Sequence, residues 1–197
     1  MITLLITTAC DGDSTQTPTS DPWPQTEYCE GLDDWPEAWA NLEWDTFDRI
    51  DAIRQEGADC EARGKWGPAP SLTRRSALDC AARFHAQDMV DREYFGRLDP
   101  EGIDARGRVD AAGYSAAVVL QHVATGPRDA HALIETTWLP RPVPCQSLLS
   151  TEVTEIGLGL VGELDEQRAT TWVLVLAAPG EPPDDPPDDP PDDPPEG

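Results

Sequence analysis

Residues Leu78-Asp-Cys-Ala-Ala-Arg-Phe-His-Ala-Gln-Asp-Met89 have a clear helical pattern. Between Leu78 and Met89, apolar side chains and His85 recur at i, i+4, i+7 and i+11, which places them on one face of a helix. The flanking residues extend the pattern and predict a helix over 76–92. A histidine on such a face is by default a hydrogen-bonded core residue, and we expect that role for His85.

Outward from this helix, the same periodicity and the strand patterns predict the remaining elements. Further helices are predicted over 37–55, 106–112 and 128–139. The first ends at Gly57, a natural helix stop, and the last is halted by the prolines at 140, 142 and 144. Two stretches rich in Val, Leu and Ile, 155–161 and 171–177, predict a strand hairpin. Helices followed by a terminal strand pair predict an α+β domain.

The charge of the chain is concentrated in its two flanks. Its 197 residues, enough for one domain, carry a formal charge of -24. Residues 10–48 hold 11 acidic and no basic residues, and residues 181–197 hold eight acidic and no basic residues. Between them lie 19 acidic and 14 basic residues without a basic patch, a balance that argues against nucleic-acid binding.

The first nine residues form a short apolar run that ends in small residues before Cys10. This pattern is typical of a bacterial lipoprotein signal, so we expect Cys10 to be lipidated, although Thr7 departs from the usual aliphatic residue. The run is short and lacks a basic start, and we therefore expect residues upstream of Met1. The alternative is an ordinary terminus with a free thiol.

Composition divides the chain into four parts. We expect a signal remnant over 1–9, a lipidated disordered spacer over 10–28, a domain over 29–180 and a disordered tail over 181–197. The tail repeats Pro-Pro-Asp-Asp, which favours an extended chain of roughly 50 Å. Weak calcium binding or spacing from the cell wall are alternatives to a solvated tail.

Cys10 apart, four cysteines remain, at positions 29, 60, 80 and 145. In an oxidising compartment they can form two bridges in three connectivities, among which spacing alone does not choose. They are scattered singly, which argues against a zinc knuckle. No serine stands in a nucleophile elbow and no phosphate-binding loop is present, so the sequence assigns no catalytic residue.

The order and wording of four segments resemble the bacterial secreted branch of the CAP superfamily, also called SCP-like or PR-1-like extracellular domains. The segments are 78–89, 94–102, 108–114 and 138–159, within a resemblance that runs from about Trp35 to Ala178. It implies an α-β-α sandwich, with a small antiparallel sheet flanked by helices. It also implies that Cys60 pairs with Cys145, which leaves Cys29 for Cys80.

Family members with an intact cleft hold a divalent metal with two histidines and acidic residues, and this sequence departs from that pattern. The two histidine positions are Arg97 and Pro144, an acidic position is Gln121, and only Glu155 matches. Because arginine is a cation and proline has no ligand atom, we expect no metal and no cofactor. Arg97 is instead expected to pair with Glu155, or with the nearby Asp99.

His122 adjoins this altered cleft. A general base beside Glu155 is one role for it, and a hydrogen-bonded structural histidine is the default. The leading hypothesis is a monomeric, lipid-anchored protein of the bacterial envelope, or a secreted one, that binds an apolar ligand or an envelope protein without catalysis. The alternatives are a hydrolase of peptides or cell-wall material that uses His122 and Glu155, and a surface-display protein whose tails matter more than its cleft.

Overall fold

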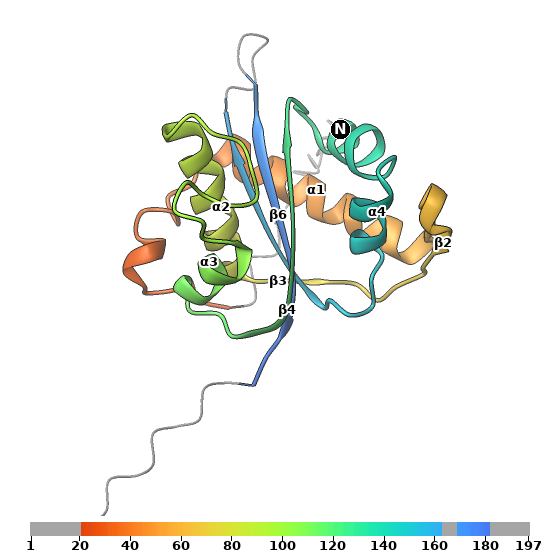
Figure 1. The fold of residues 1–197 in the computed structure, drawn as a ribbon, viewed down its shortest axis with the longest axis horizontal. Helices are drawn as coiled ribbons and strands as arrows, with labels where there is room; N and C mark the ends of the chain where they lie inside the picture. The colour runs from red at the N-terminus through yellow and green to blue at the C-terminus, as the bar shows by residue number, and fades with distance from the viewer. Residues whose placement is uncertain (1–20, 163–168, 182–197) are drawn as a thin grey trace, which may run out of the picture.

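A four-stranded sheet with helices on both faces forms the centre of the computed structural model, which describes residues 21–162 and 169–181 (Figure 1). The expected signal remnant, Cys10 and the tail from residue 182 onward lie outside the described residues. No described helix is long and apolar enough to cross a bilayer. The layering confirms the α-β-α sandwich.

Four α-helices, one π-helix and two 3-10 helices are described: η1 (Glu27–Cys29), α1 (Glu37–Glu56), η2 (Glu61–Arg63), α2 (Ser76–Asp91), α3 (Ala105–Ala111), the π-helix η3 (Ala132–Trp138) and α4 (Pro142–Leu148). The described strands are β1 (Ala58–Asp59), β2 (Lys65–Trp66), β3 (Thr73–Arg74), β4 (Ala116–Thr125), β5 (Glu155–Val161) and β6 (Thr171–Pro179). The main sheet has the order β3-β5-β6-β4. Its last three strands are antiparallel, and β3 runs parallel to β5.

The predicted helices over 37–55, 76–92 and 106–112 and the predicted hairpin are confirmed within one or two residues. The helix predicted over 128–139 is the π-helix η3, which ends at Trp138, before Pro140, as expected. The sequence did not predict that a new helix, α4, begins at Pro142. Proline is tolerated there because its missing N–H has no intrahelical partner in the first helical turn.

The two faces of the sheet build two separate cores. On β5, Ile156, Leu158 and Leu160 point to the face covered by α1, η3 and α4. On the other face lie α2 and α3, which pack small alanines against valines of β6. Figure 1 shows α2 and α3 on one side of the sheet, with α1 and α4 on the other.

The backbone of α2 lies directly against β5. A Cβ added at Gly157 would stand 2.1 Å from the carbonyl carbon of Leu78, and one at Gly159 would stand 2.4 Å from that of Ala82. Real Cβ atoms do not approach a backbone this closely. The two glycines therefore allow the helix and the strand to touch.

Beside this contact, a buried cluster of four charges links α1, β3 and α2. Arg74 donates to Asp79 at 2.9 Å and to Glu43 at 2.7 Å, and Arg83 donates to Glu43 at 2.7 Å. All four side chains are almost fully buried, and their formal charges cancel. Cancelled charges satisfied by hydrogen bonds can be tolerated in a protein interior.

The same carboxylates complete the hydrogen bonding of β5. Strand β3 pairs with β5 over two residues only, at Glu155 and Ile156, so the rest of that edge needs other acceptors. The amide of Leu158 donates to Asp79 at 2.9 Å, and the amide of Leu160 donates to Glu43 at 3.2 Å. Buried charges thus take the place of a missing strand.

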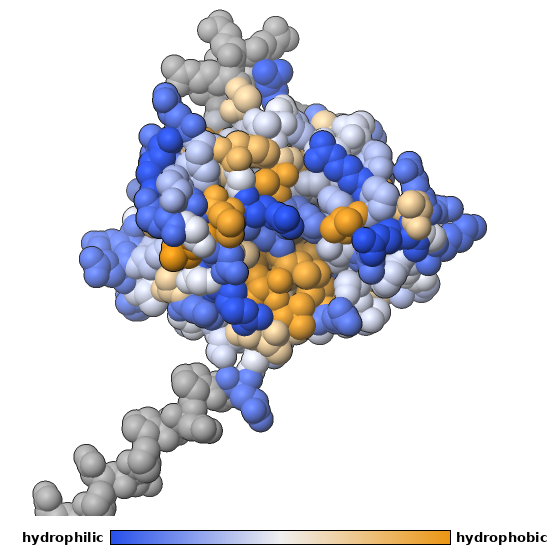
Figure 2. Space-filling view, in the orientation of Figure 1, coloured by the Kyte–Doolittle hydropathy of each residue, from blue (hydrophilic) through white to orange (hydrophobic). Residues whose placement is uncertain are grey.

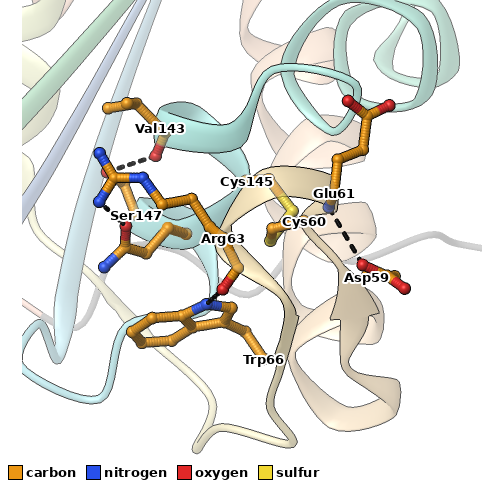
Figure 3. The surroundings of a disulfide bond; sticks show 9 residues. Asp59, Cys60, Glu61, Arg63, Trp66, Val143, Cys145 and Ser147 are labelled. Atoms are coloured by element: carbon orange, nitrogen blue, oxygen red, sulfur yellow. Dashed lines mark hydrogen bonds between the residues drawn. A yellow bond between two sulfur atoms is a disulfide. The ribbon is translucent and has the colours of Figure 1, made fainter.

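Two disulfides confirm the pairing that the family resemblance implied. Cys29 bonds to Cys80 and Cys60 bonds to Cys145, with sequence separations of 51 and 85 residues. Figure 3 shows the second bridge, which joins the segment after α1 to α4. Arg63 reinforces this junction by donating to Gln146 at 2.9 Å.

The segment before Cys29 corrects the expected spacer boundary. Residues 21–28 fall within the expected disordered spacer, but they pack on the domain. The amide of Ser76, at the start of α2, donates to the carboxylate of Asp21 at 3.2 Å, and the Trp23 indole donates to the carbonyl of Cys29 at 3.2 Å. The packed structure therefore begins at least eight residues before Cys29.

Candidate functional site

Arg97 lies in the loop between α2 and α3. Hydrogen bonds with the side chains of Arg108 and His85 hold the backbone of this loop in place. The carbonyl of Arg97 accepts a hydrogen bond from Arg108 at 2.7 Å, and the carbonyl of Gly96 lies 2.9 Å from the Nε2 atom of His85. His85 is thus the hydrogen-bonded core residue that its helical position predicted. The side chain of Arg97 is exposed above this fixed backbone.

The structure brings Arg97, His122 and Pro144 together around one cavity of about 390 Å³. We call it the His122 hollow. Its wall comes from the Arg97 loop, β4, η3 and α4, through nine residues: Phe95, Gly96, Arg97, His122, Val123, Trp138, Arg141, Val143 and Pro144. Three of the residues singled out in the sequence therefore share a site.

Gln121 belongs to a neighbouring cavity on the other face of the same strand. This Gln121 hollow, of about 360 Å³, is lined by Arg97, Leu98, Asp104, Ala105, Arg106, Val119 and Gln121. The carbonyl oxygen of Gln121 accepts a hydrogen bond from Arg108 at 3.0 Å. Since β4 is an edge strand, one hollow lies on each side of the sheet edge, and Arg97 lines both.

Figure 2 shows the face of the molecule on which this edge lies. Apolar surface gathers there over β4, beside strongly hydrophilic side chains. The strand itself supplies half-buried Val118, Val119 and Leu120. The site region is therefore an apolar strip with charged residues around it.

Glu155 lies on the opposite face of the sheet from His122. Glu155 is in register with Ala177 of β6, whereas His122 is in register with Leu174, three residues away. Because alternate residues of a strand point to opposite faces, this odd offset separates the two side chains. The alternative in which His122 acts as a general base beside Glu155 is therefore wrong, and the hydrolase hypothesis has no Glu155 carboxylate next to His122.

The expected ion pair of Arg97 is also wrong. The carboxylate of Glu155 accepts from Arg75 at 2.6 Å and from the hydroxyl of Tyr114. Asp99 accepts from the amide of Ile103 at 2.7 Å, which closes the turn of its own loop. Within the described residues, the Arg97 guanidinium makes no ion pair.

His122 is held in its neutral form. Burial lowers its pKa to about 4, and the positive charge of Arg97 acts in the same direction. Its Nε2 atom is buried and has no hydrogen-bond partner among the described residues. The default expectation of a hydrogen-bonded structural histidine therefore does not hold at this nitrogen.

The donor set of the His122 hollow does not fit the divalent metal that the family resemblance implies. His122 is the one lining residue of a metal-ligating type, while Arg97 and Arg141 are cations and Pro144 offers no ligand atom. The described residues contain no group of three His, Cys, Asp or Glu side chains close enough to hold a metal.

Sequence reasoning did not identify the other six lining residues as part of the site, among them Trp138 and Arg141. Their elements, η3 and α4, meet around the prolines that the sequence suggested as a simple helix stop. The one available signal was the presence of Trp138 at the head of a family-like segment. Periodicity carried none, because a π-helix does not follow the repeat of 3.6 residues.

Comparisons with known proteins agree with this architecture. The family model described as CAP, cysteine-rich secretory protein family, matches residues 47–176. A comparison with curated protein sequences gives no match.

Among solved structures, an extracellular protein containing an SCP domain from Bacillus anthracis is similar, with a TM-score of 0.59 and 18% identity over 71% of this chain. An outer surface protein from Borrelia burgdorferi has a TM-score of 0.57 and 14% identity over 68% of this chain and 90% of that chain. A cysteine-rich secretory protein from Staphylococcus aureus has a TM-score of 0.55 and 17% identity over 72% of this chain. This chain spans 41% of the Bacillus protein and 39% of the Staphylococcus protein.

Proposed function

Since this chain belongs to the CAP family of cysteine-rich secretory proteins, we propose that it is an exported binding module whose cleft works without a metal and without catalysis. One observation carries the proposal. In the His122 hollow, Arg97 and Pro144 stand where the family resemblance expects metal-ligating histidines. The carboxylate that would have assisted His122 lies across the sheet.

The export part of the proposal is supported by the cysteines. Two disulfides staple the described domain, and such bonds persist in oxidising compartments outside the cytoplasm. The lipobox-like sequence before Cys10 supports attachment to a membrane of the bacterial envelope through a lipid. Mass spectrometry of the native protein tests this part, and an unmodified Cys10 would remove the anchor from the proposal.

The metal-free part is tested with the purified full chain. It is soaked with excess zinc, desalted and analysed for bound metal, and we expect less than about a tenth of an equivalent to be retained. The double variant Arg97→His, Pro144→His restores both ligand types at the same positions and serves as the positive comparison. Stoichiometric zinc on the unmodified chain would contradict the proposal.

The non-catalytic part is tested separately, with peptide and cell-wall substrates. We expect no turnover above that of a matched His122→Ala variant whose unfolding is unchanged. Turnover that falls sharply in His122→Ala would overturn this part and would require a partner for His122 other than Glu155.

A further inference from the structure

The His122 hollow is cationic in a strongly acidic protein. Arg97 and Arg141 line it, and no aspartate or glutamate does. Most arginines of the described domain bind carboxylate, carbonyl or amide oxygens, namely Arg49, Arg54, Arg63, Arg74, Arg75, Arg83, Arg92, Arg106 and Arg108. Arg97 and Arg141 make no such side-chain bond within the described residues. Two exposed arginines that have no side-chain acceptor among the described residues therefore line one cavity.

Two buried nitrogens in the same wall also lack a partner. The indole Nε1 of Trp138 and the Nε2 atom of His122 have no hydrogen bond among the described residues, and Trp138 is 0% exposed. An indole N–H can only donate, so it requires an acceptor. Leaving a buried donor unpaired costs about 1–3 kcal/mol, and such groups in a cavity wall point to a ligand.

The rim of the hollow is apolar. Phe95 is 54% exposed and Val143 is 51% exposed, and they belong to two different walls of the hollow. Only three other large apolar side chains in the described part of the chain are exposed: Val90, Leu98 and Ile103. Exposed apolar side chains beside a polar cavity are typical of a site for a ligand with an apolar part.

We propose that the His122 hollow binds an oxyanion, a carboxylate or a phosphate, that carries an apolar group. The oxyanion lies between Arg97 and Arg141, which donate to it in the fork geometry that suits both anions. Trp138, whose buried indole N–H is unpaired, lines the same hollow and is assigned to the ligand as a third donor. The apolar group rests on Phe95 and Val143. A volume of about 390 Å³ suits a small molecule of this kind.

This inference rests on the proposed metal-free binding function and specifies its ligand class. A cation is disfavoured by the two arginines. A purely apolar ligand would cover the guanidinium groups without giving them an acceptor, which is costly for a charged group. An amphiphilic oxyanion satisfies the arginines, the buried nitrogens and the apolar rim together.

Calorimetric titration of the full chain tests the ligand class. The probes are octanoate, octyl phosphate, neutral octanol and acetate, each below the concentration at which it aggregates. We expect octanoate or octyl phosphate to bind at least about tenfold more tightly than octanol and acetate, because only they carry both parts. The stronger of the two identifies the anion. Octanol binding as tightly as both anions, or binding by none of the probes, would overturn the inference.

Matched variants locate the site. Arg97→Gln and Arg141→Gln are each expected to weaken anion binding about tenfold or more, since each loses a charge-assisted contact. Arg128→Gln removes the same charge from an exposed residue outside the hollow and is expected to leave binding unchanged. Equal weakening in all three variants would show a general charge effect and contradict a site at the hollow.

Trp138→Phe removes the indole N–H and keeps an aromatic side chain. We expect it to weaken anion binding several-fold, with an unfolding curve that shows a folded protein. The zinc experiment separates the two proposals. Retained zinc defeats the proposed function, whereas no zinc together with no preference for anions defeats this inference and leaves the metal-free module standing.

Discussion

Glu43 is a fully buried carboxylate in the charge cluster between α1, β3 and α2. It is 0% exposed, it accepts hydrogen bonds from Arg74 and Arg83, and it also accepts from the amide of Leu160. Burial raises its pKa, and the two arginines lower it. Removing this carboxylate would leave two buried cations with too few partners.

We therefore expect Glu43→Ala to lower the free energy of unfolding by about 3–5 kcal/mol, measured in urea. The comparison is Glu135→Ala, which breaks the partly exposed pair with Arg49 and should cost about 1 kcal/mol or less. A loss at Glu43 no larger than the loss at Glu135 would contradict the role given to the buried cluster.

Two histidines with lowered pKa values, His85 and His122, make the stability of the fold depend on pH. The pKa values of His85 and His122 are both lowered to about 4, chiefly by burial and secondarily by the charges of Arg108 and Arg97. In the unfolded chain these groups take up protons near pH 6.5, before the folded chain does. Stability is therefore fully present above about pH 6.5 and is lost as the pH falls toward 4.

We expect urea unfolding to show a loss on the order of a few kcal/mol between pH 7 and pH 4.5. The variant His85→Gln, His122→Gln isolates the contribution of the histidines, because other groups titrate in the same range. Its stability should change less over that interval than that of the parent chain. Parallel curves for the two proteins would show that these histidines are not the cause.

Among the elements, the contact of α2 with β5 fixes the sandwich. We expect Gly157→Ala to destabilise by about 1–3 kcal/mol or more, because its new Cβ would overlap the backbone of Leu78 and a helix must move. Gly96→Ala is the matched control, since its Cβ would meet its nearest atom, the carbonyl oxygen of Leu98, at an ordinary 3.5 Å. Thermal unfolding of both variants tests whether Gly157→Ala is destabilised more than Gly96→Ala. An unchanged midpoint temperature for Gly157→Ala would contradict the close contact of α2 with β5.

The sequence was sufficient to predict the helix over 76–91, because its apolar side chains keep strict helical spacing. It was not sufficient for β4. This strand has three apolar residues in a row, Val118, Val119 and Leu120, followed by the polar residues Gln121 and His122. It therefore lacks the alternation of apolar and polar residues that is typical of a strand with one buried face. Its two faces meet two different cores and two hollows. Only the sheet register could show this.

The candidate site was predictable in the same uneven way. The family resemblance gave Arg97, Gln121, Pro144 and Glu155 as cleft positions, of which Arg97 and Pro144 line the His122 hollow and Gln121 lines the neighbouring one. The sheet register places Glu155 on the face opposite His122. A resemblance in sequence identifies the residues that occupy a family motif. It does not show which face of the sheet their side chains point to.

For the whole molecule, the two disulfides act on opposite sides of the sheet. The Cys60–Cys145 bridge has a sequence separation of 85 residues, and the segment between its cysteines contains β3, α2, α3, β4 and η3. We expect the Cys60→Ala, Cys145→Ala variant to lose about 4 kcal/mol of unfolding free energy, from the greater freedom of its unfolded state. Chemical denaturation of this variant beside Cys29→Ala, Cys80→Ala checks the value. A stability equal to that of the parent would show that the bridge does not constrain the chain.

The Cys29–Cys80 bridge has a mechanical consequence. A force applied to the chain at Asp21 is transmitted along the backbone to Cys29. There the disulfide with Cys80 carries part of it directly into α2. From there the load spreads into β5, against which the helix lies in backbone contact. Because residues 21–28 are held by hydrogen bonds and the next point of attachment is a disulfide, we expect this segment to detach under tension before the sandwich opens.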